Sequence, residues 1–187
     1  ESQQRIVDIL QKTHIHFCTP CYGGQILEGC FSSYLRFSML ATKYGIPFSV
    51  DTLINESLVS RARNSLVAKF LANPKATHLM FVDADITFTP DDILRLVLHN
   101  KDVVCGAYPM KTIPIKYVLN IDENGIHEDP LYEVKTAGTG FMMIKREVIE
   151  DMIEKMPELK YKDSVGLGEQ YEPHMYALFD TMIDERQ

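Results

Sequence analysis

Short apolar runs alternate with longer amphipathic ones along the first half of the chain. The short runs have the length and composition of strands buried in a parallel sheet. The longer runs carry apolar residues at helical spacing and end near glycine, proline or asparagine. We predict strands over Ile15–Cys18, Phe48–Leu53, His78–Val82, Val103–Tyr108 and Phe141–Ile144, and helices over Phe31–Tyr44, Leu58–Ala72 and Arg146–Met156.

One further helix has a clear start signal at Thr89. Threonine is a favoured N-cap residue, and Pro90 suits the first helical position. Asp91 and Asp92 then lie at the positive end of the helix. Helix chemistry explains both acids, and we assign them no catalytic role.

The second half of the chain favours antiparallel pieces. Tyr117–Ile121 and Leu131–Val134 flank a turn at Asp122–Gly125, which predicts a hairpin with a longer loop. The predicted fold class is α/β, with a Rossmann-like, mostly parallel sheet flanked by helices and an appended antiparallel hairpin region. Ligands of such sheets bind beyond the carboxyl ends of the strands, so site residues are expected there.

Length and charge restrict the function classes. The 187 residues suit one domain, and the formal net charge of -7 argues against general nucleic-acid binding, which needs a basic face. No apolar run approaches the roughly 20 residues that span a bilayer. No secretory leader is recognisable, so we expect no membrane segment and a cytoplasmic location. The single C-x-x-C at Cys18 and Cys21 supports no structural zinc site, and the four cysteines are interpreted as reduced thiols.

Two carboxylates directly follow a predicted buried strand. Asp83 and Asp85 are separated by one small residue, so an extended chain points both to the same side. An acid that follows a buried strand seldom lacks a partner. Two hard oxygen donors at the rim of the sheet suit Mg²⁺ or Mn²⁺. The sequence therefore predicts a metal site at Asp83 and Asp85, which would offset the repulsion between an acidic protein and a phosphorylated ligand.

Two arginines lie in the helix predicted over Leu58–Ala72. On a helical wheel Arg63 falls inside the buried arc, whereas Arg61 falls opposite it. We expect Arg63 to reach Asp83, a phosphate, or both. An ion pair that only positions the acid explains Arg63 equally well, and Arg61 is interpreted as a solvated residue.

The ends of the first two strands add polar groups. Thr19 and Pro20 end the first strand, and Asp51 closes or follows the second. In a nucleotide site these residues would meet the base and ribose. A turn cap is the alternative role for Asp51.

Two later segments are candidates for an acceptor or sugar pocket. In Gly138, Thr139 and Gly140 the glycines allow the backbone to approach a ligand closely, although a bulge at a hairpin edge has the same composition. Tyr108 and Lys111 follow a strand and are expected to form one wall of the pocket.

The segment Phe81-Val82-Asp83-Ala84-Asp85-Ile86, after two strand–helix units, resembles glycosyltransferases of the GT-A fold. The helix with Arg61-Ala62-Arg63-Asn64 and the strand around Asp102–Pro109 strengthen this resemblance, which covers about residues 13 to 156. It implies transfer of a sugar from a UDP- or GDP-type donor to a glycan or other hydroxyl acceptor, with Mn²⁺ or Mg²⁺. It also implies that Asp85 binds the metal and that Asp83 contacts the ribose or the metal. Thr19 and Asp51 would line the nucleoside pocket.

The chain departs from that family after Gly140. The family usually carries a later acidic pair for base catalysis and a histidine for the metal, and neither is recognisable before Gln187. Glu169, Asp180 and Asp184 are the remaining candidates for a catalytic base. We expect residues 1–187 to form one GT-A-like domain that lacks its C-terminal part.

Two other functions fit parts of the pattern. Asp83-Ala84-Asp85-Ile86-Thr87 matches the D-x-D-x-T signature of haloacid-dehalogenase-like phosphatases, in which the first aspartate is a nucleophile. That motif usually ends the first strand of its domain, whereas two strand–helix units precede it here. A domain that binds a nucleotide-sugar or glycan without turnover is the other alternative.

Overall fold

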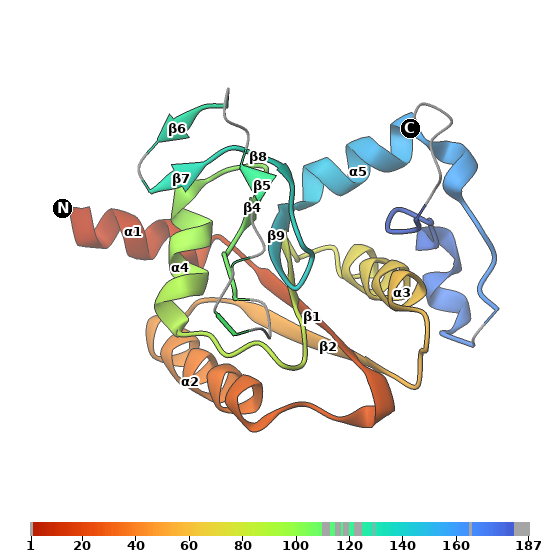
Figure 1. Cartoon of the computed structure of the whole chain (residues 1–187), viewed down its shortest axis with the longest axis horizontal. Helices are drawn as coiled ribbons and strands as arrows, with labels where there is room; N and C mark the ends of the chain where they lie inside the picture. The colour runs from red at the N-terminus through yellow and green to blue at the C-terminus, as the bar shows by residue number, and fades with distance from the viewer. Residues whose placement is uncertain are drawn as a thin grey trace.

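A computed structural model shows an α/β fold built on an open five-stranded sheet (Figure 1). It describes residues 2–181 except 110–112, 115–116, 118–119, 122–124, 129 and 165. The strands of the sheet lie in the order β2-β1-β3-β9-β4. They span Phe48–Ile54 (β2), Ile15–Cys21 (β1), His78–Val82 (β3), Phe141–Lys145 (β9) and Val103–Cys105 (β4).

Four of these strands run in one direction, and β9 runs in the opposite direction. β1 pairs in parallel with both β2 and β3, whereas β9 pairs antiparallel with β3 and with β4. The predicted mostly parallel sheet is therefore confirmed, and β9 inserts between two strands that precede it in the chain. The carboxyl ends of β1, β2 and β3 meet at one edge of the sheet.

Helices cover both faces of the sheet (Figure 1). The helices are α1 (Ser2–Gln11), α2 (Glu28–Tyr44), α3 (Val59–Ala72), α4 (Pro90–His99) and α5 (Arg146–Lys155), with short 3-10 turns η1 (Tyr22–Gly24), η2 (Pro157–Leu159) and η3 (Glu169–His174). None of these helices, within the described residues, is long and apolar enough to cross a bilayer.

The alternation of side chains along each strand divides the core into two clusters. Phe17, Met80 and Met143 pack against α2 and α4 on one face. Phe81 and Met142 belong to the cluster on the other face, which includes residues of α3 and α5.

The predicted hairpin region is present in the described residues as two small antiparallel pairs. β5 (Asn120–Ile121) pairs with β8 (Val134–Thr136), and β6 (His127–Glu128) pairs with β7 (Leu131–Tyr132). The β6–β7 pair was not predicted. Of the predicted turn, residues 122–124 lie outside the described residues.

Several predicted boundaries shift by a few residues. β1 continues through Pro20, which pairs in register with Leu53, and ends at Cys21. β4 ends at Cys105 instead of continuing to Tyr108. A β-carbon on Gly106 would lie 2.4 Å from the Phe141 ring, so the chain passes this ring too closely for a side chain at that position.

The helix start predicted at Thr89 is confirmed. The Thr89 hydroxyl accepts a hydrogen bond from the Asp92 backbone N–H, and the Asp92 carboxylate accepts one from the Thr89 backbone N–H. This reciprocal capping box satisfies two backbone donors that the helix leaves without partners.

Removal of this cap is expected to destabilise the fold. Thr89→Ala should lower the free energy of unfolding by about 1 kcal/mol, since it removes the hydroxyl that takes part in the capping box with Asp92. Thr89→Ser keeps the hydroxyl and should retain most of that stability. Urea unfolding followed by circular dichroism measures both variants, and equal losses in the two would contradict the capping role.

Candidate functional site

The segment after β3 is held in place by backbone hydrogen bonds from two sides. The Asp83 N–H donates to the Gly140 carbonyl over 2.8 Å, and the Leu27 N–H donates to the Ala84 carbonyl over 2.9 Å. The Ile86 N–H donates to the Asp83 carbonyl over 3.0 Å, which closes a turn. The approach to β9 and the start of α2 thus fix the Asp83–Asp85 segment at the carboxyl end of the sheet.

Arg63 reaches this segment from α3, as its helical phase predicts. Its Nη2 lies 2.6 Å from Asp83 Oδ1, and its Nη1 donates to the Thr139 carbonyl over 3.4 Å. The guanidinium also lies over the Phe81 ring, 4.9 Å from the ring centre. The Arg63 side chain is only 6% exposed, whereas that of Asp83 is 36% exposed. A buried cation is therefore paired with a carboxylate that still meets solvent.

Asp85 is exposed beyond this ion pair. The charges of Asp83 and Asp85 act on the neighbouring thiol of Cys30, whose Sγ lies 3.6 Å from the Asp83 carbonyl oxygen. Burial, Cys21 and these two carboxylates together raise the pKa of Cys30 to about 12. Asp83 and Asp85 thus place two carboxylates on this segment. Arg63 orients Asp83, and Asp85 is exposed to solvent.

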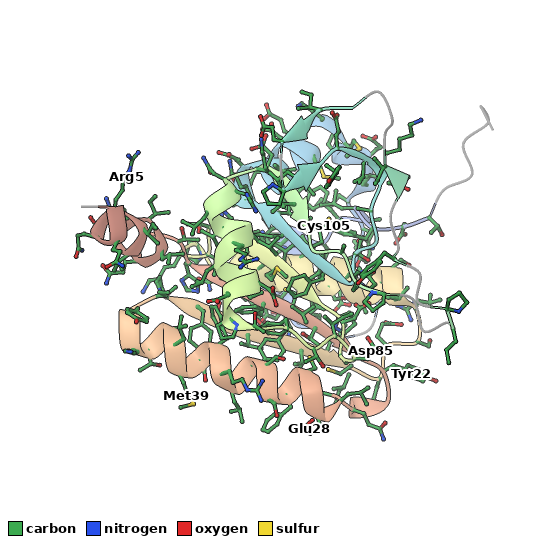
Figure 2. The ribbon with its side chains drawn as sticks, turned by 60° about the vertical axis from the view of Figure 1, so that its left-hand side comes forward. Arg5, Tyr22, Glu28, Met39, Asp85 and Cys105 are labelled. Atoms are coloured by element: carbon green, nitrogen blue, oxygen red, sulfur yellow. The ribbon has the colours of Figure 1, made fainter. Side chains whose placement is uncertain are left out.

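A cavity of about 430 Å³ opens in front of Asp83 and Asp85. This volume is within the range typical of small-molecule sites. We call it the first cavity; it is lined by Pro20, Tyr22, Gln25, Leu27, Glu56, Ser57, Val59, Ala62, Asp83, Ala84 and Asp85. Tyr22 and Asp85 are labelled at the same end of the molecule in Figure 2. Tyr22, Leu27 and Val59 expose much of their surface, so the cavity has an apolar side as well as an acidic one.

Glu56 contributes a third carboxylate to the first cavity, which the sequence did not indicate. It accepts two hydrogen bonds from Arg61, from Nε over 2.6 Å and from Nη2 over 2.8 Å, and one from the Leu58 N–H over 3.0 Å. The Arg61 hydrogen bonds hold the pKa of Glu56 below its usual range. Arg61 is therefore paired with Glu56 across the loop that starts α3. The only signal in the sequence was an acid just before a predicted helix.

Thr19 and Pro20 take different positions. Pro20 lines the first cavity, whereas Thr19 is fully buried against α2. The Thr19 hydroxyl lies 2.6 Å from the hydroxyl of Tyr34, whose pKa is raised by burial. Side chains alternate between the two faces of β1, and Thr19 lies on a face that is buried in the core.

Asp51 lies within β2 and does not line the first cavity. Its carboxylate pairs with Lys69 of α3 over 3.1 Å and with His16 of β1 over 3.2 Å. Partial burial raises the pKa of Asp51, but the hydrogen bonds from His16 and Lys69 outweigh it and leave the pKa below its usual range. Its contacts join α3 to the sheet.

The Gly138–Gly140 segment and Tyr108 lie beside Asp83. A β-carbon on Gly140 would lie 2.8 Å from both Asp83 Oδ2 and the Tyr108 hydroxyl oxygen, so a side chain at this position would displace one of them. Thr139 meets Arg63 through its carbonyl oxygen. Lys111 lies outside the described residues.

Two candidates for a catalytic base, Asp180 and Glu169, do not line the first cavity. Asp180 accepts a hydrogen bond from Asn64 over 2.8 Å, and the Asn64 side chain in turn accepts one from the Phe179 N–H over 2.9 Å. This buried asparagine holds the C-terminal segment on α3. Glu169 lies in the first turn of η3, and Asp184 is outside the described residues.

Asp83 and Asp85 are the carboxylates that the structure offers for a metal at this segment. Within the described part of the chain, no group of three or more histidine, cysteine, aspartate or glutamate side chains is arranged to hold a metal ion. His174, at the end of η3, belongs to no such group. A cation at Asp83 and Asp85 would take its remaining ligands from water and from a bound phosphate.

Comparison with known proteins supports the fold. No protein-family model and no curated protein matches the chain. The crystal structure of A197 from STIV superposes with a TM-score of 0.50 and 23% identity, covering 86% of this chain and 77% of that one. The crystal structure of 4-diphosphocytidyl-2C-methyl-D-erythritol synthase from Anaerococcus prevotii superposes with a TM-score of 0.45 and 14% identity, covering 86% of this chain and 83% of that one. At these identities the likeness to A197 is one of α/β fold alone.

Proposed function

We propose that this protein is a metal-dependent glycosyltransferase that uses a nucleoside diphosphate sugar as donor and a hydroxyl compound as acceptor. One observation carries the proposal: an outward-facing Asp85 and an Arg63-bound Asp83 line one cavity together with the exposed ring of Tyr22. Acidic and aromatic groups thus lie in a single cavity at the carboxyl edge of the sheet, where ligands of such folds bind.

The residues present fit Mg²⁺ or Mn²⁺ bound together with a diphosphate. Glu56, Asp83 and Asp85 place three carboxylates around the first cavity. Arg61 and Arg63 offset the charges of Glu56 and Asp83, and a cation beside Asp85 would reduce the repulsion between Asp85 and a diphosphate. Mg²⁺ is commonly held by one or two carboxylates, with phosphate oxygens and water completing its shell. When bound, the metal ion would neutralise the charge that develops on the departing diphosphate.

The apolar side of the first cavity suits the nucleoside. Tyr22 is 75% exposed, which leaves its ring face accessible to a nucleobase. Leu27 and Val59 expose apolar surface on the same cavity. The proposed donor would stack its base on Tyr22 and direct its diphosphate toward Asp85.

The reaction then breaks the bond between the sugar C1 and the diphosphate oxygen. The acceptor oxygen forms the new bond to C1, and its proton passes to a base. Asp83 would be held by Arg63 at a fixed distance from the diphosphate, while Asp85 would contact the cation. The base remains unassigned among the described residues, because neither Asp180 nor Glu169 lines the first cavity.

The ion pair makes the phosphatase alternative less attractive. A nucleophilic aspartate must present an oxygen to phosphorus. Asp83 Oδ1 is bound by a buried guanidinium, and Asp83 Oδ2 is beside Gly140 and Tyr108. Substrate preference separates the classes: a glycosyltransferase slowly hydrolyses its donor, a phosphatase prefers a phosphomonoester, and a non-catalytic binding domain turns over neither.

Nucleotide binding is expected to depend on both metal and Asp85. Calorimetric titration with UDP and GDP should detect binding with Mn²⁺ that weakens at least tenfold without it. Asp85→Asn should lose this metal dependence, since it removes a charged oxygen ligand. Asp91→Asn removes an exposed acid from the first turn of α4 and should bind as the wild type does. If neither nucleotide binds the wild type with the metal present, the proposed function is wrong.

Removal of the Tyr22 ring is expected to weaken the nucleotide irrespective of the metal. Base stacking on an aromatic ring contributes about 1–3 kcal/mol, so Tyr22→Ala should reduce affinity about tenfold or more. Tyr44→Ala removes an exposed tyrosine at the other end of α2 and serves as the control. The same titration with ribose 5-phosphate, which lacks a base, should not distinguish Tyr22→Ala from wild type; a loss there would argue against stacking.

The two aspartates should differ in their effect on stability. Asp83→Ala leaves the buried Arg63 cation unpaired and is expected to lower the free energy of unfolding by about 3 kcal/mol. Asp85→Ala should change it by about 0.5 kcal/mol or less, since Asp85 is exposed. The double variant Asp83→Ala/Arg63→Met removes the buried charge and should regain much of the loss. Metal-free urea unfolding tests this order, and equal effects of the two aspartates would refute it.

A further inference from the structure

A second cavity of about 310 Å³ lies beside the Asp83–Asp85 segment. It is bounded by the loop after that segment, one face of α4, β4 with the residues that follow it, and the β6–β7 hairpin. We call it the second cavity; its lining is Ile86, Thr87, Phe88, Asp92, Arg95, Leu96, His99, Val104, Cys105, Gly106, Ala107, Tyr108, Pro130, Leu131 and Phe141. Figure 2 labels Cys105, which belongs to its β4 wall.

The α4 wall of the second cavity presents one guanidinium, that of Arg95, and one carboxylate, that of Asp92. Asp92, Arg95, Leu96 and His99 recur at the spacing of one helix face. The Asp92 carboxylate is already engaged in the capping box with Thr89. Within the described part of the chain, Arg95 takes part in no ion pair. Arg95 therefore presents to the second cavity a guanidinium that no carboxylate of the described residues holds in an ion pair.

The opposite wall of the second cavity connects it to the proposed reaction centre. Val104, Leu131 and Phe141 make this wall apolar. Tyr108 also belongs to it, and the Tyr108 hydroxyl oxygen lies at the surface of Gly140 beside Asp83 Oδ2. A ligand that fills the second cavity would thus touch a tyrosine that adjoins the Asp83 carboxylate.

We propose that the second cavity binds the acceptor and selects a hydroxyl compound that carries an anionic group, a carboxylate or a phosphate. The inference rests on the proposed function, because it supplies the second substrate of that reaction. Arg95 would take the anion in the two-pronged geometry that a guanidinium offers. The apolar wall and Tyr108 would contact the carbon skeleton, and a hydroxyl of the acceptor would point toward Asp83.

The charge of the protein favours this assignment. The chain carries a formal charge of -7, and the first cavity is lined by three carboxylates, two of which are paired with arginines. An anionic compound would be repelled from most of such a surface, so a local cation is needed to bind it. A neutral sugar requires no arginine, and a cationic acceptor would be repelled by Arg95. The volume of the second cavity accommodates a ligand of about monosaccharide size.

Binding of simple sugars tests the proposal. D-glucuronate and glucose 6-phosphate carry the two kinds of anion, and D-glucose is the neutral control of the same shape. Each is titrated by ligand-observed NMR into the protein with Mg²⁺ and the nucleotide that binds best. Arg95→Gln is compared with Arg5→Gln, which removes an exposed arginine from α1, away from the second cavity in Figure 2.

We expect at least one anionic sugar to bind the wild type at least tenfold more tightly than glucose. Arg95→Gln should remove that preference and leave nucleotide affinity unchanged, whereas Arg5→Gln should change neither. The proposal is overturned if glucose binds as well as both anions, if Arg95→Gln keeps the preference, or if no sugar binds at 20 mM. Nucleotide affinity measured on the same samples shows separately whether the proposed function fails.

Discussion

The contact between the buried Arg63 guanidinium and Asp83 determines the geometry of the whole site. An arginine this buried needs a partner, because an unpaired charge in a core is costly. Asp83 provides the charge, the Thr139 carbonyl provides a further acceptor and Phe81 provides a ring face. The pair also joins α3 to the end of β3 and to the segment before β9. One carboxylate of the D-x-D triplet is therefore part of the framework that holds α3, β3 and the approach to β9 together.

Much of this arrangement was predictable from local pattern. The run His78–Val82 followed by Asp83 indicated a buried strand that ends at an acid, and the helical phase of Arg63 indicated its inward direction. The Thr89 cap was evident because its chemistry is contained in four consecutive residues. Such features depend only on residues that are close together in the sequence, so local sequence patterns predict them.

Features that depend on distant pairing were not predictable in this way. The alternation of side chains along β1 predicts two faces but does not predict which residues line a cavity. We expected Thr19 in the site, whereas it lies in the core. The partner of Asp180 is Asn64, far away in the chain, and no local signal connects them. Glu56 was overlooked because an acid before a helix has an ordinary structural explanation. Lys111 and Asp184 stay predictions, since they lie outside the described residues.

The position of β9 has a consequence for how this chain acquires its structure. β9 follows β4 in the chain yet lies between β3 and β4 in the sheet, where it hydrogen-bonds to both. A growing polypeptide therefore cannot complete the sheet until residue 145 has left the ribosome, and until then the edge of β3 has no partner. Pairing between such distant segments is slow relative to local helix formation. Because the Asp83 N–H donates to the Gly140 carbonyl beside β9, the Asp83–Asp85 segment gains this hydrogen bond only in this late step.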